Sequence, residues 1–251
     1  MSNKIALVTG ATSGIGLATA EILSKNGFDL ILCGRRQERL DDISVRLSTF
    51  SRNITLNFDV RQKESVLTAI ASLPTDWKDI DVLINNAGNA HGMNTFDAGD
   101  LNDWDAMIDG NVKGLLYVSK AVVPQMVARK TGHIVNISSV AGKTTYATGA
   151  VYCASKKAVE AISEGMRLDL TQHGIKITNV APGAVETEFS VVRFKGDVAR
   201  ASKVYEGFDP LLPEDIADAI FYAINAPARM TLADITIYAA AQAAPTTVYR
   251  K

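Results

Sequence analysis

Short apolar segments alternate with longer segments of helical periodicity along most of this sequence. The predicted strands are rich in Val, Ile and Leu and span 4–9, 29–33, 54–58, 81–85, 133–138, 176–180 and, more weakly, 234–238. The predicted helices span 14–26, 37–47, 63–73, 103–129 (in two pieces near Gly110), 151–173 and 213–223. Strands that are apolar along their whole length need cover on both faces. The sequence therefore predicts an α/β fold, with a single doubly wound parallel sheet and helices on both faces.

Length and composition fit one domain over 1–251 with a large core. Hydrophobic residues make up 47% of the 251 residues and charged residues 21%. The net charge of −1 provides no basic field, so neither nucleic acid nor membrane is expected as a partner. The two cysteines are too few for a disulfide framework, and the apolar stretch 5–8 is too short for a signal peptide or a membrane span. We expect a cytoplasmic protein, and no metal site.

A glycine-rich turn joins the first predicted strand to the first predicted helix, and it reads Thr-Gly-Ala-Thr-Ser-Gly-Ile-Gly over 9–16. A helix N-terminus presents unpaired N–H groups and the positive end of the helix dipole, so it can hold a pyrophosphate. Glycines permit the tight turn, the approach of phosphates and close packing of helix on strand. A dinucleotide is the expected ligand, and a glycine-rich turn without a ligand is the alternative. The expected contacts are Gly10, Thr12, Ser13, Gly14, Ile15 and Gly16.

The end of the second predicted strand decides which dinucleotide is expected. An acidic residue at this place holds the ribose 2′-hydroxyl of NAD, and it would repel a 2′-phosphate. The sequence has no acidic residue here, because 33–36 reads Cys-Gly-Arg-Arg. Arg35 and Arg36 could clamp a 2′-phosphate through paired hydrogen bonds, which predicts NADP as the cofactor. The alternative is a solvated basic turn that opens a helix, with Arg39 three residues on.

Tyr152 and Lys156 stand at i and i+4 in the predicted helix 151–173, so they share one face. An ammonium near a phenol favours the phenolate, so we expect Lys156 to lower the pKa of Tyr152 and suit it to proton exchange with a substrate oxygen. Alone, the pair is more typical of a helix surface. Two polar runs support the functional interpretation, because 85–88 and 136–139 both follow strands, and ligands bind at the carboxyl ends of parallel strands. Asn111, a poor helix residue within a helical stretch, also suggests a special role.

Together these motifs resemble the short-chain dehydrogenase/reductase family, in order, at family spacing and over nearly the whole chain. The residues that carry the resemblance are Thr9, Gly10, Gly14, Ile15, Gly16, Asn85, Asn86, Ala87, Gly88, Asn111, Ser139, Tyr152, Lys156, Pro182 and Gly183. The resemblance implies a Rossmann-like fold and four catalytic residues. Ser139 would hydrogen-bond the substrate oxygen, Tyr152 would donate or accept the proton, Lys156 would bind the nicotinamide ribose and lower the tyrosine pKa, and Asn111 would hold a proton-relaying water.

The same resemblance implies further contacts with the cofactor. Asp59 and Val60 would flank the adenine. Asn86, Ala87 and Gly88 would line the adenosine-ribose side, and Pro182, Gly183, Val185 and Thr187 would surround the nicotinamide, with Thr187 on its carboxamide. Family members commonly pair through two long helices, here about 111–129 and 151–173, so a homo-oligomer, either a dimer or a tetramer, is implied.

A closer resemblance narrows the substrate. Gly-Arg-Arg-Gln-Glu-Arg-Leu at 34–40, Thr-Glu-Phe-Ser at 187–190 and Val-Arg-Phe-Lys-Gly-Asp at 192–197 are similar to the NADP-dependent 3-hydroxy acid dehydrogenases, including serine 3-dehydrogenases and malonic semialdehyde reductases. These act on serine, allo-threonine, 3-hydroxyisobutyrate or 3-hydroxypropionate, or on the matching oxo acids. The stretch 184–209 lacks periodicity and is predicted to be a lid. Its Arg193 could bind the substrate carboxylate or merely pin the lid to an acidic neighbour.

Two alternative functions stay open at this point. Another short-chain reductase, acting on 3-oxoacyl carrier protein or on carbonyl compounds broadly, would share the same motifs, although a carrier-protein partner favours a basic rim that a net charge of −1 does not suggest. A non-catalytic NADP-binding regulator is the more remote alternative, because all four catalytic residues are present. No role is assigned to the alanine-rich stretch 239–251.

Overall fold

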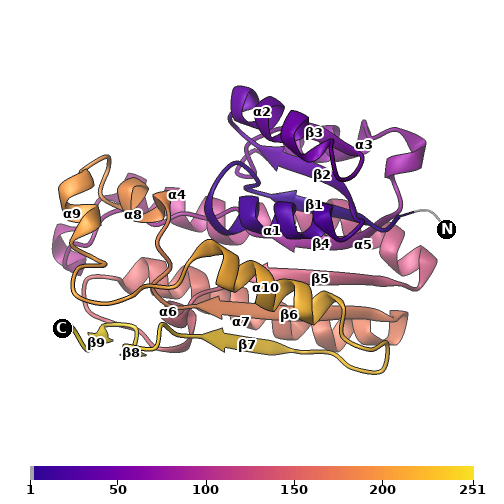
Figure 1. The fold of residues 1–251 in the computed structure, drawn as a ribbon. Helices are drawn as coiled ribbons and strands as arrows, with labels where there is room; N and C mark the ends of the chain where they lie inside the picture. Colours follow the sequence, from indigo (N-terminus) through magenta and orange to yellow (C-terminus); the bar gives the residue numbers. More distant parts are fainter. Residues whose placement is uncertain (1–2) are drawn as a thin grey trace.

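Seven parallel strands form one sheet in the computed structural model, which describes residues 3–251 (Figure 1). The strand order is β3-β2-β1-β4-β5-β6-β7, and every neighbouring pair is parallel. The strands are β1 (Ile5–Thr9), β2 (Asp29–Gly34), β3 (Asn53–Asn57), β4 (Ile80–Asn85), β5 (Gly132–Ile137), β6 (Ile175–Pro182) and β7 (Asp234–Ile237). The chain runs outward in one direction from β1 and then in the other from β4. The order therefore reverses between β1 and β4, which is the switch point at which doubly wound sheets bind ligands. The predicted fold class is confirmed.

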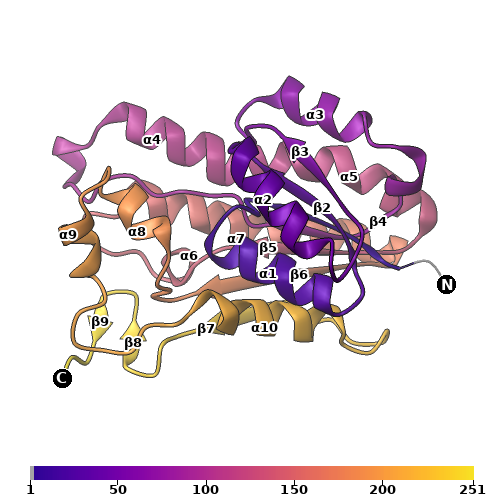
Figure 2. The same ribbon diagram turned by 45° about the horizontal axis from the view of Figure 1, so that its top comes forward.

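Helices cover both faces of this sheet, as Figures 1 and 2 show. One face carries α1 (Gly14–Lys25), α2 (Gln37–Leu47) and α10 (Pro213–Ile224). The other carries α3 (Lys63–Ala71), α5 (Leu115–Arg129) and α7 (Ala150–Leu170). The remaining segments are α4 (Leu101–Ile108), α6 (Val140–Lys143), α8 (Glu188–Arg193), α9 (Val198–Ser202), the short helices η1 (Thr75–Trp77), η2 (Phe96–Ala98), η3 (Asp109–Gly114) and η4 (Thr171–His173), and the hairpin β8 (Gln242–Ala244) and β9 (Thr247–Val248).

The core has two halves because side chains alternate across a strand. Along β1, Ala6 and Val8 pack in the apolar cluster under α1, α2 and α10, while Ile5 and Leu7 pack in the cluster under α3, α5 and α7. All four are buried. Burial on both faces fixes the register of the strands, and it thereby fixes the positions of the loops that leave their carboxyl ends.

The predicted helix 103–129 is interrupted, as expected near Gly110, but by a π-helical segment rather than by a turn. This segment, η3, lies between α4 and α5 and contains Asn111. The first helix begins at Leu101, two residues earlier than predicted, because the Asp100 side chain accepts a hydrogen bond from the Asn102 N–H and caps it. Single π-helical turns are frequent at functional sites.

Four elements at the carboxyl end of the sheet were not predicted from the sequence. They are α6, α8, α9 and the β8–β9 hairpin, each too short to leave a periodic signal. The stretch 184–209, predicted as irregular, thus holds two short helices. Figure 1 shows α8, α9 (orange) and the hairpin (yellow) gathered at the end where the strands point. The Lys251 N–H donates to the Gly207 carbonyl, so the C-terminal residues pack against the end of this stretch.

Candidate active site

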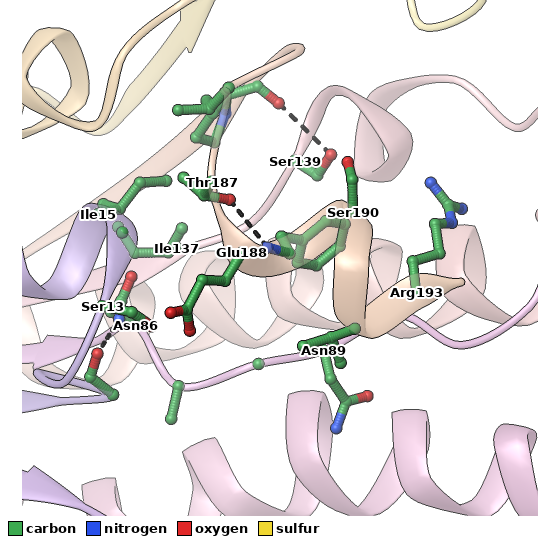
Figure 3. Close-up of a pocket in the computed structure, with 18 of the residues that line it drawn as sticks. Ser13, Ile15, Asn86, Asn89, Ile137, Ser139, Thr187, Glu188, Ser190 and Arg193 are labelled. Atoms are coloured by element: carbon green, nitrogen blue, oxygen red, sulfur yellow. Dashed lines mark hydrogen bonds between the residues drawn. The ribbon is translucent and has the colours of Figure 1, made fainter. Parts of the chain in front are cut away.

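A cavity of about 420 Å³ opens at the carboxyl ends of β1, β2, β4, β5 and β6. This volume is within the usual range for small-molecule sites. Of the site residues predicted from the sequence, all except Gly16, Asp59 and Asn111 line it. Figure 3 shows the cavity extended between Ser13 and Ile15 at one end and Arg193 at the other, with Thr187 between them. A cavity of this extended shape can hold an elongated cofactor with a small substrate beyond it.

The turn between β1 and α1 has a backbone that glycine alone adopts easily. Gly10 has φ +67° and Gly14 φ +53°, both in the left-handed region. A Cβ on Gly16 would lie 2.3 Å from the Gly10 carbonyl oxygen, so any larger residue there would push the turn away from the helix. Ser13 is the N-cap of α1, but its side chain makes no capping hydrogen bond. The first N–H groups of α1 are therefore free of a capping side chain, as an anion site requires.

Asn86 holds this turn from the end of β4. Its amide donates to the carbonyls of Thr9 (2.9 Å) and Gly10 (3.3 Å). The N–H groups of Asn86 and Ala87 both donate to the Thr9 hydroxyl, at 3.0 Å. The Asn86 side chain is thus bonded to the protein itself, and Thr9 is a structural residue to which sequence reasoning gave no role of its own.

The arginines after β2 lie at the same end of the cavity, but they are not free of carboxylates. The Arg36 guanidinium donates to Thr12 Oγ1 (2.8 Å) and Ser13 Oγ (3.1 Å), and it also pairs with Glu188 Oε2 at 3.0 Å. Arg35 lies 3.5 Å from Asp59 Oδ2. The stretch 33–36 itself has no acidic residue, as the sequence analysis states, but a carboxylate from α8 reaches the site through space.

Asp59 and Val60, which are both expected beside the adenine, have different positions relative to the cavity. Val60 lines the cavity. The Asp59 carboxylate instead accepts three hydrogen bonds from the Arg61 side chain, at 2.6 and 3.0 Å to Oδ2 and at 3.1 Å to Oδ1. Burial works against the negative charge of Asp59, yet the hydrogen bonds from Arg61 prevail and lower its pKa. The implied contact of Asp59 with an adenine stays a prediction.

Three predicted catalytic side chains meet at the middle of the cavity. Tyr152 and Lys156 project from the first turns of α7, and both are buried, at 7% and 5% exposed. Ser139 is the N-cap of α6, where its Oγ accepts from the Ala141 N–H (3.1 Å) and donates to the Pro182 carbonyl (3.4 Å). The Lys156 ammonium donates to the Ile137 carbonyl at 2.9 Å. The ends of β5 and β6 and the start of α7 thus bring the three side chains together.

The charge states of Tyr152 and Lys156 differ from the sequence expectation. Burial raises the pKa of Tyr152, the neighbouring Tyr146 adds to the rise, and Ser139 and Arg193 only partly oppose it. Burial also lowers the pKa of Lys156 to about 8. The prediction that Lys156 lowers the pKa of Tyr152 is therefore wrong. Desolvation penalises both charges, and Lys156 contacts a backbone carbonyl rather than the phenol.

Asn111 lies behind the cavity wall and joins three segments. Its Oδ1 accepts from the Asn89 N–H (2.7 Å), and its Nδ2 donates to the Asn89 carbonyl (2.8 Å) and to Ser155 Oγ (3.0 Å). A Cβ on Gly88 would lie 2.9 Å from Asn111 Oδ1 and 3.4 Å from Lys156 Nζ, so glycine is needed at this approach. Asn111 thus fixes the loop after β4 against α7, and its implied role in holding a water stays a prediction.

The loop after β6 forms the opposite wall. Pro182, Gly183, Val185 and Thr187 all line the cavity, and Thr187 caps α8 by accepting from the Phe189 N–H (3.1 Å). Gln242, on the C-terminal hairpin, is buried and accepts from the Ala184 N–H at 2.9 Å. Sequence reasoning missed Gln242, because no local pattern connects it to this loop.

Arg193 closes the far end of the cavity. Its guanidinium carbon lies 5.1 Å from the centre of the Tyr152 ring, and Nη2 donates to the Tyr146 hydroxyl at 2.9 Å. Its buried Nε has no hydrogen-bond partner among residues 3–251. Sequence reasoning missed other residues around this end, which are Tyr146, Phe189, Ser190 and Tyr205. Arg193 thus presents an unsatisfied donor next to Tyr152.

Comparison with known proteins agrees with this geometry. The family model for short chain dehydrogenases matches residues 4–197. The chain belongs to the short-chain dehydrogenase family. As a short-chain dehydrogenase, it is an oxidoreductase that acts on hydroxyl groups. The assignment of single residues to catalysis and cofactor binding remains a prediction from motif and geometry.

Similar short-chain dehydrogenases narrow the class. The NADP-dependent 3-hydroxy acid dehydrogenase YdfG of Salmonella typhi is 44% identical over 229 residues, which cover 91% of this chain and 92% of that protein. The sulfoacetaldehyde reductase 2 of Chromohalobacter salexigens is 41% identical over 96% of each chain. The closed form of a serine dehydrogenase complexed with NADP+ superposes with a TM-score of 0.92 at 40% identity, over 98% of this chain and 100% of that one. In the described part of the chain, no helix meets the length and hydropathy needed to cross a membrane.

Proposed function

We propose that this short-chain dehydrogenase transfers a hydride between NADP(H) and a short 3-hydroxy acid or its 3-oxo counterpart. The observation that carries the proposal is the position of Arg193, whose guanidinium lies over the Tyr152 ring with one donor unsatisfied. A substrate whose reacting oxygen met Tyr152 would hold an acidic group within reach of that guanidinium. The names of the relatives, a 3-hydroxy acid dehydrogenase and a serine dehydrogenase, support the same class.

The residues present fit NADP(H). The turn of Gly10 and Gly14 and the uncapped start of α1 would hold the pyrophosphate. Arg35 and Arg36 would hold the 2′-phosphate, and Thr12 and Ser13 already orient the Arg36 guanidinium. Val185 and Thr187 would flank the nicotinamide, with Lys156 on its ribose. When bound, the cofactor supplies or receives the hydride.

The chain's own side chains would handle the proton. Ser139 would donate a hydrogen bond to the reacting oxygen of the substrate, and the Tyr152 hydroxyl would give that oxygen a proton in reduction or take one in oxidation. Burial favours a neutral phenol, so Tyr152 in the free protein suits the role of proton donor. Lys156, with a pKa of about 8 and its ammonium on the Ile137 carbonyl, would keep an exchangeable proton in the site at neutral pH.

The segment 184–209 would serve as a lid over the substrate. It carries Phe189, whose ring centre is 5.8 Å from that of Tyr152, and Arg193. It contacts the loop after β4 and the start of α4 through polar groups: the Gly92 N–H donates to the Arg193 carbonyl, and Lys195 pairs with Asp100 (3.7 Å) and Asp103 (3.0 Å). A segment held by polar contacts of this kind, which water can replace, can open for a substrate and close over it to exclude water. The homo-oligomer and the cytoplasmic location also stay predictions.

A sulfonate is the second candidate for the anionic group. The 41% identity with a sulfoacetaldehyde reductase favours it, and a guanidinium binds sulfonate oxygens as readily as carboxylate oxygens. Both candidates share the chemistry at Tyr152, so the difference between them lies only in the group that faces Arg193.

A substrate panel with NADP+ tests the proposal. We expect turnover of serine, allo-threonine, 3-hydroxyisobutyrate or 3-hydroxypropionate to exceed that of an uncharged alcohol of similar size by at least about 10-fold, since one charge-assisted contact is worth about 1.5–3 kcal/mol. In Arg193→Ala this advantage should disappear. Arg200→Ala is the matched control, because Arg200 stacks on Phe194 of the same segment instead of lining the cavity.

Two results would contradict the proposal. One is equal turnover of charged and uncharged alcohols by the unmodified protein. The other is an equal loss on both substrate types in Arg193→Ala. A clear preference for 2-hydroxyethanesulfonate over every hydroxy acid would instead select the sulfonate candidate.

A further inference from the structure

Glu188 links the lid segment 184–209 to the arginines that follow β2, at the end of the cavity where Ser13 and Ile15 lie. It is the first residue of α8, and its carboxylate pairs with Arg36 at 3.0 Å and Arg39 at 2.7 Å. These partners lie in and just after the turn between β2 and α2, about 150 residues away in sequence. Figure 3 shows the Glu188 carboxylate directed to the same end of the cavity as Ser13, whereas Arg193, from the same helix, points to the other end.

The Arg36 guanidinium is shared between two sets of partners. On one side it donates to Thr12 Oγ1 and Ser13 Oγ, in the turn that would hold the phosphates. On the other side it pairs with Glu188. Arg36 and Glu188 are 42% and 47% exposed, so the ion pair contributes less than about 1 kcal/mol and can be exchanged for another anion. Glu188 would keep Arg39 as a partner after such an exchange.

The carboxylate is charged whenever a cofactor would bind. Hydrogen bonding to Arg39, and then to Arg36, lowers the pKa of Glu188 despite its partial burial. A 2′-phosphate on Arg36 would bring a second anion to a guanidinium that already holds one, and like charges at such distances repel. A cofactor with a free 2′-hydroxyl would bring no second charge.

We infer that Glu188 competes with the 2′-phosphate of NADP(H) for Arg36, and so weakens the binding of NADP(H) selectively while leaving that of NAD(H) nearly unchanged. The inference rests on the proposed use of NADP(H). Glu188 would thereby lower the affinity for NADP(H). A lower affinity speeds the release of the cofactor, which must leave the protein in every catalytic cycle.

Glu188→Gln tests the inference, with Glu186→Gln as the matched control. Both changes remove one negative charge from the same segment, but Glu186 has no ion-pair partner among the described residues. We expect the Kd of NADPH, measured by calorimetry or by nicotinamide fluorescence, to fall about 3- to 10-fold in Glu188→Gln, and that of NADH less than about 2-fold. In Glu186→Gln both should stay within about 2-fold of the unmodified protein.

A double-mutant cycle with Arg39→Gln separates competition from a general change in charge. Loss of Arg39 leaves Glu188 with Arg36 alone, so the Kd of NADPH should rise. The same change in the Glu188→Gln background should have a clearly smaller effect, because the competing carboxylate is gone. Glu188 is half exposed, so these variants should fold.

The outcomes are distinguishable. If the unmodified protein binds NADPH no better than NADH, the proposed cofactor fails and the inference fails with it. If the unmodified protein prefers NADPH, but Glu188→Gln binds it no more tightly than Glu186→Gln or more weakly, competition is overturned while the proposed function stands. Equal effects of Arg39→Gln in both backgrounds would also overturn it.

Discussion

Burial decides the charge of the two central side chains of this site. Lys156 is almost inaccessible to solvent, its ammonium has a backbone carbonyl as partner, and its pKa falls to about 8. The Tyr152 phenol is equally buried, and its pKa rises. The protein therefore maintains two groups that each resist ionisation. A bound cofactor with a positively charged ring would lower the pKa of Tyr152 and favour the phenolate, because it adds a positive charge beside the phenol.

The pKa of Lys156 makes a stability prediction. Above its ordinary pKa of 10.5, Lys156 is neutral in the folded and the unfolded chain. As the pH falls from 10.5 to about 8, only the unfolded chain gains the proton, so the free energy of unfolding decreases, by about 3 kcal/mol at pH 7. Lys156→Met removes this cost and loses one hydrogen bond worth about 1 kcal/mol. We expect the variant to be more stable than the unmodified protein by about 2 kcal/mol at pH 7.

Urea unfolding of the cofactor-free protein at pH 7 and pH 9.5 measures this. The advantage of Lys156→Met should shrink as the pH rises, because the unfolded chain then binds fewer protons. Lys157→Met, at the exposed neighbouring position, is the control and should show no such pH-dependent gain. A Lys156→Met variant less stable than the unmodified protein at pH 7 would contradict the argument.

At the scale of elements, the contact between α1 and the turn that precedes it has no room for a side chain. A Cβ at Gly16 would lie 2.3 Å from the Gly10 oxygen and 2.4 Å from the Asn86 amide nitrogen. The same amide holds the turn to β4. The helix start, the turn and the end of β4 therefore form one packed unit, and a displacement of one part moves the others.

Gly16→Ala should therefore lower the free energy of unfolding by about 1–3 kcal/mol through overpacking. It should also weaken NADPH binding at least about 10-fold, since the turn that would hold the phosphates moves. Gly165→Ala is the control, because Gly165 lies within α7 and, outside that helix's own backbone, no atom of residues 3–251 lies within 4 Å of its added Cβ. That change should raise stability by up to about 1 kcal/mol. Thermal unfolding and a cofactor titration of both variants decide the matter, and normal NADPH binding by Gly16→Ala would refute the expectation.

At the scale of the whole molecule, segments from the early and the late parts of the sequence line the same cavity. The turn between β1 and α1, which would hold the phosphates, comes from residues 9–16. The opposite wall of the cavity is supported by Gln242 from the C-terminal hairpin. The Arg250 guanidinium donates to the Val204 carbonyl (3.1 Å) and lies over Phe208, so the last residues also hold the end of the lid segment. The C-terminal stretch, to which the sequence analysis gave no role, thus supports the site.

Gln242→Ala should affect stability and cofactor binding together. It leaves the Ala184 N–H without its partner, which costs about 1–3 kcal/mol, and it loosens the loop that would surround the nicotinamide. We expect a raised KM for NADPH with a smaller change in kcat. Gln172→Ala is the control, since the exposed Gln172 amide donates to the nearby Asp169 carbonyl. If the two variants unfold at the same temperature, Gln242 has no supporting role.

Much of the fold and part of the site follow from short-range features of the sequence. The apolar strands gave the sheet and its two covered faces, and the Tyr152–Lys156 spacing placed both side chains on one face of α7, as the structure has them. Features that depend on contacts between distant segments were missed or predicted wrongly. Glu188 was not connected with Arg36, Gln242 was not connected with the loop after β6, and the pKa direction expected for Tyr152 was wrong.

The sequence by itself determined the parallel sheet, the glycine-rich turn between β1 and α1 and the spacing of Tyr152 and Lys156, because periodicity and glycine conformation act within a few residues. Only the tertiary structure decided which charges share a guanidinium, which end of the chain supports the cavity and how burial shifts each pKa. Those properties depend on the distance between segments far apart in the chain and on the exclusion of water, and neither is encoded in any local pattern.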